Sequence, residues 1–313
     1  MRRLLTGFLK AAIVLFVLLN IITAFHAYKF THFYDAASAP APGATKSGWQ
    51  GAKEIFFGAK AYKQPAIMRP GAEYQPVIFT TADKIKLQGW QHKLDSSAKG
   101  TVLLFHGHGS KKSAVLDEAA GFTKMGYNTL LIDFRAHGNS GGNTSTIGFY
   151  ETEEVKLAYQ FIKEQGEQNI ILWGISMGAA TVSKAIHQYH LAPRKVILEM
   201  PFASILQAAE GRIKMMGLPA EPLAGLVTFW GGVENGFWAF NMKPATFVRS
   251  IQCPVLLQWG KNDPRVQQAE TDEIYRNIIA PKKLVEYANS GHQSLCTNEN
   301  EKWMKEVNDF LQK

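Results

Sequence analysis

The chain has 313 residues, 46% of them hydrophobic and 19% charged, which is enough for one large core or for one domain with a tail. Its formal net charge is +8, but the lysines and arginines are scattered in runs of no more than two. A nucleic-acid-binding protein gathers such charge in a basic stripe, so we expect no nucleic-acid partner, and a mild attraction to anionic lipid fits better.

The first 35 residues differ in character from the rest. The run from Leu4 to Phe25 is apolar apart from four polar residues, and it approaches the ~20 residues that a membrane-spanning helix needs. Arg2, Arg3 and Lys10 favour a cytoplasmic N-terminus. We therefore expect residues 1–35 to be a single-pass anchor in membrane lipid, with the remainder outside the cytoplasm, in the periplasm or at the cell surface. A cleaved signal peptide and a buried or interfacial helix are the alternatives.

Residues 36–75 indicate a linker followed by an irregular lead-in. Residues 36–46 are rich in Ala, Pro, Gly and Ser, as in a stalk. Residues 48–75 contain aromatic side chains without a clear period. From Pro76 onward the pattern is regular, so we assign residues 76–313 to one domain.

The pattern of this domain predicts a hairpin, formed by residues 77–81 and 85–91, and then an alternation of strands and helices. The expected strands are 101–105, 128–134, 170–173, 196–200, 251–259 and 283–287, and the expected helices are 113–125, 148–165, 179–186, 266–278 and 300–311. Such alternation is typical of an α/β fold with a mostly parallel sheet and helices on both faces. Cys253 and Cys296 are expected at opposite ends of this sheet, as free and mostly buried thiols.

One segment interrupts the alternation. Residues 203–250 have no strand pattern, and they combine helical pieces, Gly and Pro breaks and many aromatic side chains. An insertion after a strand's carboxyl end overhangs the functional edge of such a sheet, so we expect a small helical cap. Trp230, Phe237 and Trp238 are then candidates for an apolar substrate-binding wall, and ordinary packing against the sheet is the alternative.

A short motif, Gly174-Ile175-Ser176-Met177-Gly178, connects the strand at 170–173 to the helix at 179–186. A G-x-S-x-G sequence between a strand and a helix forms a sharp, strained turn that presents the serine hydroxyl at the carboxyl end of the sheet. Glycine is needed at both ends because a Cβ there would clash with the crossing strand and helix. The motif predicts that Ser176 is a nucleophile.

A serine nucleophile needs a base, and the base needs an orienting acid. In this fold they follow the serine in the order acid, histidine. Asp263 comes directly after the strand at 251–259, and His292 follows the strand at 283–287. We therefore expect Ser176, Asp263 and His292 to form a catalytic triad. Glu199 is the alternative acid, whereas Asp133 is expected to be a structural partner of nearby backbone.

The triad also requires donors for the oxyanion that forms during acyl transfer. The backbone N–H of Met177 is the expected second donor, and the loop His106-Gly107-His108-Gly109 is the expected source of the first, at His108. The H-x-H pattern could ligate zinc, but Lys111 would repel a cation, so we expect neither a metal nor a cofactor. His137 precedes the serine and is expected to belong to a structural turn.

The chain resembles the α/β-hydrolase superfamily, and within it the Bem46-like and serine-aminopeptidase-like (S33-type) serine hydrolases. The matching pieces span roughly Pro76 to the C-terminus. They are His106-Gly107, Asp133-x-Arg135-Ala136-His137-Gly138-x-Ser140, Gly174-x-Ser176-x-Gly178, Leu198-Glu199-Met200-Pro201-Phe202, Gly260-x-x-Asp263-x-x-Val266 and Gly291-His292. The resemblance implies an eight-stranded, mostly parallel sheet and a Ser–Asp–His hydrolase, but no particular substrate. Ala136 stands where the family usually has glycine.

These features predict a membrane-anchored serine hydrolase that cleaves a small-molecule acyl ester through an acyl-enzyme. A serine aminopeptidase or amidase is the alternative within the class. It would need an acidic group for the substrate amine, for which the cap offers Glu210, Glu221 and Glu234. An alternative of another class is a non-catalytic module of the same fold that binds a ligand or partner at the membrane.

Overall fold

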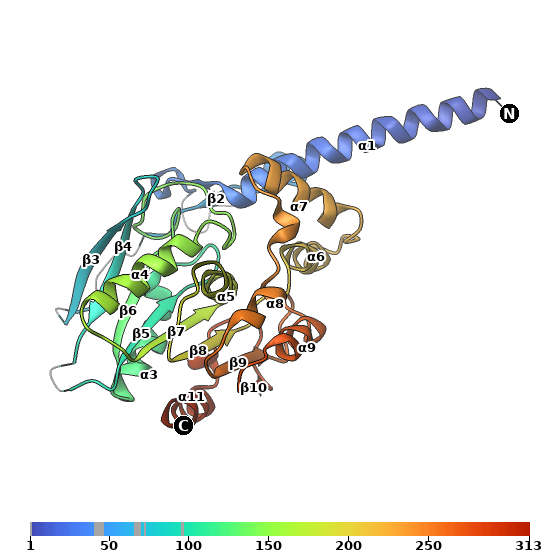
Figure 1. Ribbon diagram of the computed structural model, residues 1–313. Coiled ribbons are helices and arrows are strands. Elements are labelled where there is room, and N and C mark those ends of the chain that lie inside the picture. Colours follow the sequence, from blue (N-terminus) through green and yellow to red (C-terminus); the bar gives the residue numbers. More distant parts are fainter. Residues whose placement is uncertain (1, 41–46, 66–69, 72, 95–96) are drawn as a thin grey trace.

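The computed structural model describes residues 2–40, 47–65, 70–71, 73–94 and 97–313. Within this part of the chain one eight-stranded sheet has the order β10-β9-β8-β7-β5-β6-β4-β3 (Figure 1). The strands are β3 (Tyr74–Thr80), β4 (Lys86–His92), β5 (Thr101–Phe105), β6 (Asn128–Ile132), β7 (Ile170–Ile175), β8 (Lys195–Glu199), β9 (Val255–Gly260) and β10 (Lys282–Tyr287).

The sheet is mostly parallel, as predicted. The hairpin strands β3 and β4 are antiparallel to each other, and β4 is antiparallel to β6. All the other pairings are parallel. Strands β5 and β9 are buried along their whole length, because a parallel sheet is covered by helices on both faces.

The helices form a layer on each face of the sheet. In Figure 1, α4 (Thr152–Glu164) and α5 (Met177–Tyr189) lie in front of it. On the other side, α3 (Leu116–Lys124) and α11 (Asn300–Gln312) pack together through the rings of Phe122 and Trp303, whose centroids are 5.4 Å apart. The remaining elements of the body are η2 (Lys112–Val115), α9 (Gln268–Asn277) and α10 (Leu295–Asn298). Cys253 and Cys296 are free thiols, as expected, and Cys296 is buried.

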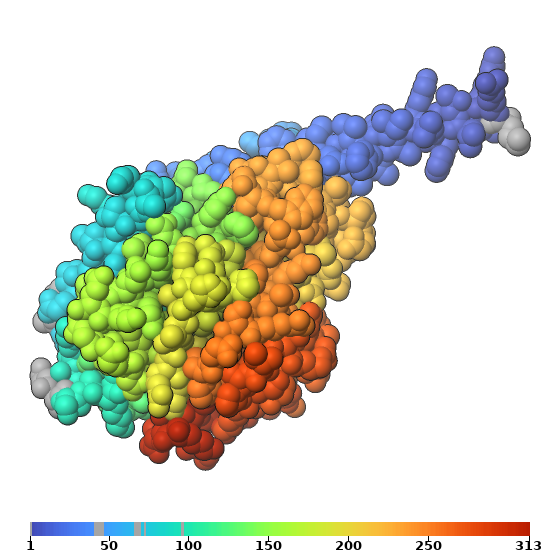
Figure 2. Space-filling model, viewed as in Figure 1, coloured from blue at the N-terminus to red at the C-terminus, as the bar shows by residue number. Residues whose placement is uncertain are grey.

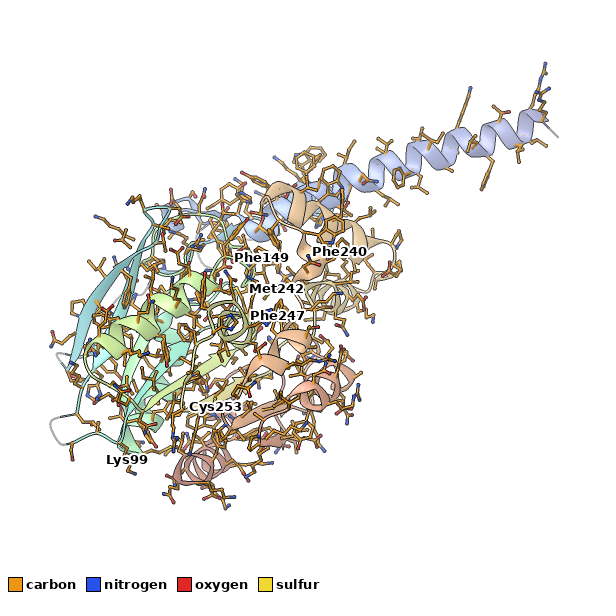
Figure 3. All side chains as sticks on the ribbon, viewed as in Figure 1. Lys99, Phe149, Phe240, Met242, Phe247 and Cys253 are labelled. Carbon is orange, nitrogen blue, oxygen red and sulfur yellow. The ribbon has the colours of Figure 1, made fainter. Side chains whose placement is uncertain are left out.

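The cap is helical, with α6 (Ile205–Met215), α7 (Leu223–Glu234), η3 (Ala239–Asn241), α8 (Pro244–Phe247) and η4 (Val248–Ser250). Phe149, Met242 and Phe247 lie where the cap meets the body (Figure 3). The Phe149 ring stacks on Phe237 at 4.2 Å, and the Phe247 ring stacks on His187 of α5 at 5.1 Å. Met242 is fully buried. These contacts hold the cap against the body.

The N-terminal helix α1 (Arg2–Thr31) projects from the body (Figures 1 and 2). Its 30 residues extend over ~45 Å, and it is long and apolar enough to cross a membrane. Residues 2–18 are exposed, whereas the C-terminal part packs against α7 of the cap. There the Trp230 Nε1–H donates a hydrogen bond to Asn20 Oδ1 at 3.1 Å.

The lead-in at 36–75 is not irregular throughout, contrary to our expectation. It contains α2 (Gly48–Phe57), the short helix η1 (Ala36–Ser38) and the strand β2 (Ala61–Tyr62), which pairs in parallel with β1 (Phe33–Tyr34). A capping box starts α2: Ser47 and Gln50 each hydrogen-bond the other's backbone N–H. Residues 41–46 of the expected linker lie outside the described part of the chain.

Candidate active site

The turn that holds Ser176 is strained and closely packed. Ser176 separates β7 from α5 and has φ 54° and ψ −117°, a conformation that costs a non-glycine residue about 1–3 kcal/mol. Its N–H donates to the carbonyl of Glu199 at 2.8 Å. A Cβ at Gly174 would lie 2.6 Å from the backbone of Gly178, and one at Gly178 would overlap the Phe105 carbonyl oxygen of β5. The two glycines therefore allow strand and helix to cross, and the crossing holds the turn.

The side chains of Asp263 and His292 lie with Ser176 at the carboxyl edge of the sheet. The Nε2 atom of His292 is 2.9 Å from Ser176 Oγ, and its Nδ1 is 2.6 Å from Asp263 Oδ2. The other carboxylate oxygen of Asp263 accepts hydrogen bonds from the N–H groups of Arg265 and Val266 at 2.7 and 3.0 Å. These bonds orient the carboxylate toward His292 Nδ1, and His292 Nε2 faces the serine hydroxyl.

The alternative acid, Glu199, has a different place. Its Oε1 accepts hydrogen bonds from Trp173 Nε1, Gln258 Nε2 and Trp303 Nε1 at 2.9, 2.9 and 2.6 Å, and none of its hydrogen bonds in the described chain reaches His292. Burial raises the pKa of Glu199 to about 8. A neutral carboxyl group that joins β7, β9 and α11 serves structure, and it cannot stabilise an imidazolium as a carboxylate does.

The loop after β5 lies directly against the serine. A Cβ at Gly107 would be 3.4 Å from Ser176 Cβ. The next residue, His108, packs its ring against those of Phe30 and Phe33, at centroid distances of 4.4 and 5.3 Å. Met177 is the first residue of α5, so its N–H has no partner within the helix. The role of the backbone N–H groups of His108 and Met177 as oxyanion donors stays a prediction.

Two further histidines hold this loop through hydrogen bonds between their rings and the backbone. His106 Nε2 accepts from Phe134 N–H at 3.2 Å, and His106 Nδ1 lies 2.7 Å from its neighbour's carbonyl. His137 Nε2 accepts from Gly109 N–H at 2.9 Å, and its Nδ1 donates to the carbonyl of Arg135 at 2.8 Å. Burial lowers the pKa of His106 to about 4 and that of His137 to about 3, so both rings are neutral. They act as structural cross-links, which leaves no free nitrogen on either ring for a metal.

The turn after β6 is also structural. Asp133 accepts hydrogen bonds from the N–H groups of Lys112 and Asn139 at 2.6 and 2.9 Å, and it pairs with the buried Lys112 ammonium group. Ala136 has φ 63°, a left-handed conformation that glycine adopts at lower cost.

A cavity of about 810 Å³ opens in front of Ser176 and His292, a volume typical of ligand-binding pockets. The cap forms one side of it. The other side comes from α1 and α2, which sequence reasoning did not associate with the site. The lining residues include Ala27 and Phe30 of α1, Gly51 and Ile55 of α2, and Ile205, Ala209, Ile213, Val227, Thr228 and Phe237 of the cap. Most of this lining is apolar.

Of the three aromatic candidates for the cavity wall, one lines the cavity and two do not. Phe237 lines the cavity, as predicted. Trp230 does not, because α7 presents Val227 to the cavity and Trp230 to Asn20 of α1. Trp238 is 55% exposed and also lies outside the cavity lining. The prediction for the two tryptophans is therefore wrong, since the aromatic composition of the cap does not show which side of α7 another element covers.

The fold and the arrangement at the sheet edge define the chain as an α/β-hydrolase, and comparisons with known proteins agree. The profile of the serine aminopeptidase S33 family matches residues 96–228. The uncharacterized protein YqkD of Bacillus subtilis is 28% identical over 225 residues, which cover 70% of this chain and 73% of YqkD. The lysophosphatidylserine lipase ABHD12 of Xenopus tropicalis is 24% identical over 212 residues, which cover 62% of this chain and 50% of that lipase.

Solved structures show the same relationship. The esterase Pf2001 of Pyrococcus furiosus matches with a TM-score of 0.66 and 26% identity, over 81% of this chain and 98% of the esterase. The chain has the α/β-hydrolase fold and is similar to S33-type members of that superfamily. These similar proteins thus include an esterase and a lipase.

Proposed function

We propose that the chain is a serine hydrolase that cleaves acyl esters of lipid-like molecules through a Ser176–His292–Asp263 triad. The observation that supports the proposal is the continuous series of contacts from Asp263 through His292 to Ser176 Oγ, which opens into a largely apolar cavity. A non-catalytic binding module would not need a strained serine hydrogen-bonded to an oriented histidine.

The geometry suggests the following steps. His292 Nε2 takes the proton of Ser176 as Oγ attacks the ester carbonyl, and the imidazolium is stabilised by Asp263. The N–H groups of Met177 and His108 donate to the oxyanion. His292 then gives the proton to the leaving alcohol oxygen, and an acyl-enzyme forms. Water, deprotonated by the same nitrogen, attacks the acyl-enzyme and releases the acid.

An ester fits this site better than a peptide with a free amine. Among the described residues, Glu210, Glu221 and Glu234 of the cap do not line the cavity. Glu54 and Glu118 do, but burial raises the pKa of Glu118 to about 7, so that it carries only part of a charge near neutral pH. Glu118 is therefore a weak partner for an ammonium group, and Glu54 of α2, which already has an interaction of its own, is the other carboxylate of the lining.

The apolar cavity predicts a dependence on acyl-chain length, because each buried methylene stabilises a complex by about 0.8 kcal/mol. Ala209 of α6 lines the cavity. Ala209→Trp should fill part of it and lower kcat/KM about tenfold for every two methylenes that no longer fit. Acetyl esters and labelling by a fluorophosphonate should be affected little. The measurement is kcat/KM over a series of esters from acetyl to long acyl chains.

Trp238→Ala serves as the control, because Trp238 is exposed and outside the cavity. It should leave the chain-length profile unchanged. A profile that shifts with Trp238→Ala and not with Ala209→Trp would contradict the cavity as the acyl site.

We also propose that α1 anchors the enzyme in a membrane with its catalytic domain outside the cytoplasm. Arg2, Arg3 and Lys10 lie at the free end of this apolar helix, which favours a cytoplasmic N-terminus. Protease added to intact spheroplasts should digest the catalytic domain. Complete protection, with a periplasmic control protein digested, would reverse the orientation. Recovery of a chain that lacks residues 1–35 would indicate a cleaved signal instead.

A further inference from the structure

Two arginines line the same cavity as Ser176 and His292. Arg212 belongs to α6 of the cap, and Arg265 lies in the loop after β9, two residues after Asp263. The Arg212 guanidinium lies over the Phe30 ring of α1, 4.4 Å from its centroid. In the part of the chain that the structure describes, neither side chain forms an ion pair or a hydrogen bond with a carboxylate. Both residues are exposed, so an anion from solution or from a lipid can reach their guanidinium groups.

The other ionisable groups around the cavity do not neutralise this pair. Lys29 adds a further positive charge, and its ammonium group donates to the Tyr34 hydroxyl. Glu118 accepts a hydrogen bond from Ser294 at 2.5 Å and has a pKa raised by burial to about 7. Glu54 of α2 is the remaining carboxylate of the lining. The cavity thus combines an excess of positive charge with apolar walls.

Two guanidinium groups that line one cavity repel each other. Partial desolvation and the charge of the neighbouring Arg265 lower the pKa of the Arg212 guanidinium, although Arg212 still reaches solvent. An anion between the two groups would remove the repulsion. Guanidinium groups bind phosphate and carboxylate through paired N–H donors, and these charge-assisted hydrogen bonds are about twice as strong as neutral ones. The pair therefore has the chemistry of an anion-binding site.

We propose that Arg212 and Arg265 bind an anionic group, phosphate or carboxylate, on the alcohol side of the ester substrate. The proposal rests on the proposed ester hydrolysis and specifies its substrate class as an anionic single-chain amphiphile. The charge belongs on the alcohol side because the apolar wall formed by α1, α2 and the cap suits only the hydrocarbon part of the acyl group. A neutral ester with the same acyl chain would leave both guanidinium groups unpaired.

The test compares two esters with one acyl chain, a 1-acylglycerol 3-phosphate and the neutral 1-monoacylglycerol, with the full chain in neutral detergent micelles. The wild-type protein should prefer the phosphate ester. Arg212→Gln and Arg265→Gln should each lower kcat/KM for that ester about 10- to 100-fold, as expected for the loss of a charged hydrogen bond. Hydrolysis of the monoacylglycerol should change little.

Lys214→Gln is the matched control, since Lys214 lies on the same helix, 59% exposed and 3.9 Å from Glu210. It should leave the preference unchanged. If Arg212→Gln and Arg265→Gln affect both esters equally, or if the wild-type protein shows no preference, the anionic subsite is wrong, although ester hydrolysis still stands. If inorganic phosphate alone inhibits monoacylglycerol hydrolysis as strongly as the phosphate ester does, the site binds a free anion and not the substrate.

Binding to a Ser176→Ala variant separates this inference from the proposed chemistry. That variant should bind the phosphate ester more tightly than the monoacylglycerol, and the difference should disappear when Arg212→Gln is added. This result would support the anionic subsite even if the wild-type protein hydrolysed neither ester, an outcome that would refute the proposed function alone. Equal binding of the two esters would refute the subsite.

Discussion

Replacing Ser176 by alanine is expected to abolish labelling by a fluorophosphonate and to lower ester turnover by a factor on the order of 10⁴ to 10⁶. The probe reacts only with a hydroxyl that a base deprotonates, and His292 Nε2 lies 2.9 Å from this one. The effect is large because every covalent step of the proposed mechanism passes through Ser176 Oγ. Labelling in a gel and kcat for a soluble ester are the two measurements.

Ser183→Ala provides a control on the same helix. The Ser183 hydroxyl is buried and donates only to the carbonyl of Ala179 at 2.9 Å. We expect this variant to label like the wild-type protein, with a small change in melting temperature. If the Ser176→Ala protein is folded and still reacts with the probe, the nucleophile lies elsewhere.

Replacing Asp263 by asparagine is expected to lower kcat by about 10⁴, the effect that such a change has in other serine hydrolases. Asparagine can donate a hydrogen bond to His292 Nδ1 and so favour the tautomer whose Nε2 carries the proton. That nitrogen could no longer accept the proton of Ser176. The Asp263 side chain also accepts two backbone N–H groups, so melting temperatures must accompany the kinetics.

Glu199→Gln is the matched comparison for the acid. Glutamine keeps an oxygen for the three donors that surround Glu199 Oε1 and resembles the neutral carboxyl group. We expect its kcat to stay within a few-fold of the wild-type value. A crippled Glu199→Gln beside an active Asp263→Asn would show that the acid is misassigned.

Much of this arrangement could be predicted because its signals are local. The buried strand at 101–105 is a run of apolar side chains, and the structure has β5 over the same residues. The motif around Ser176 could be recognised because a Cβ at either of its glycines would clash with backbone atoms. Asp263 and His292 could be associated with Ser176 because the carboxyl ends of parallel strands meet at one edge of the sheet.

The walls of the cavity could not be predicted in the same way. The α2 helix has a capping signal at Ser47 and Gln50, but nothing in its sequence indicates that Ile55 lines the cavity in front of Ser176. Trp230 is an aromatic residue of the kind that lines apolar pockets. Its indole N–H instead donates a hydrogen bond to Asn20, about 200 residues away along the chain. These positions depend on which elements pack together. Hydrophobic periodicity shows only that one face of a helix or strand is buried, and not what buries it.

The sequence by itself therefore determined the sheet, the strained serine turn and the chain order of serine, acid and histidine, because each follows from neighbouring residues or from the ends of parallel strands. Only the tertiary structure decided that the N-terminal helix is part of the site. It also decided that Glu199 is a buried group bonded to three donors away from His292 and that Arg212 and Arg265 line one cavity. The reason is that burial and the pairing of charges depend on residues far apart in the chain, which meet only after folding.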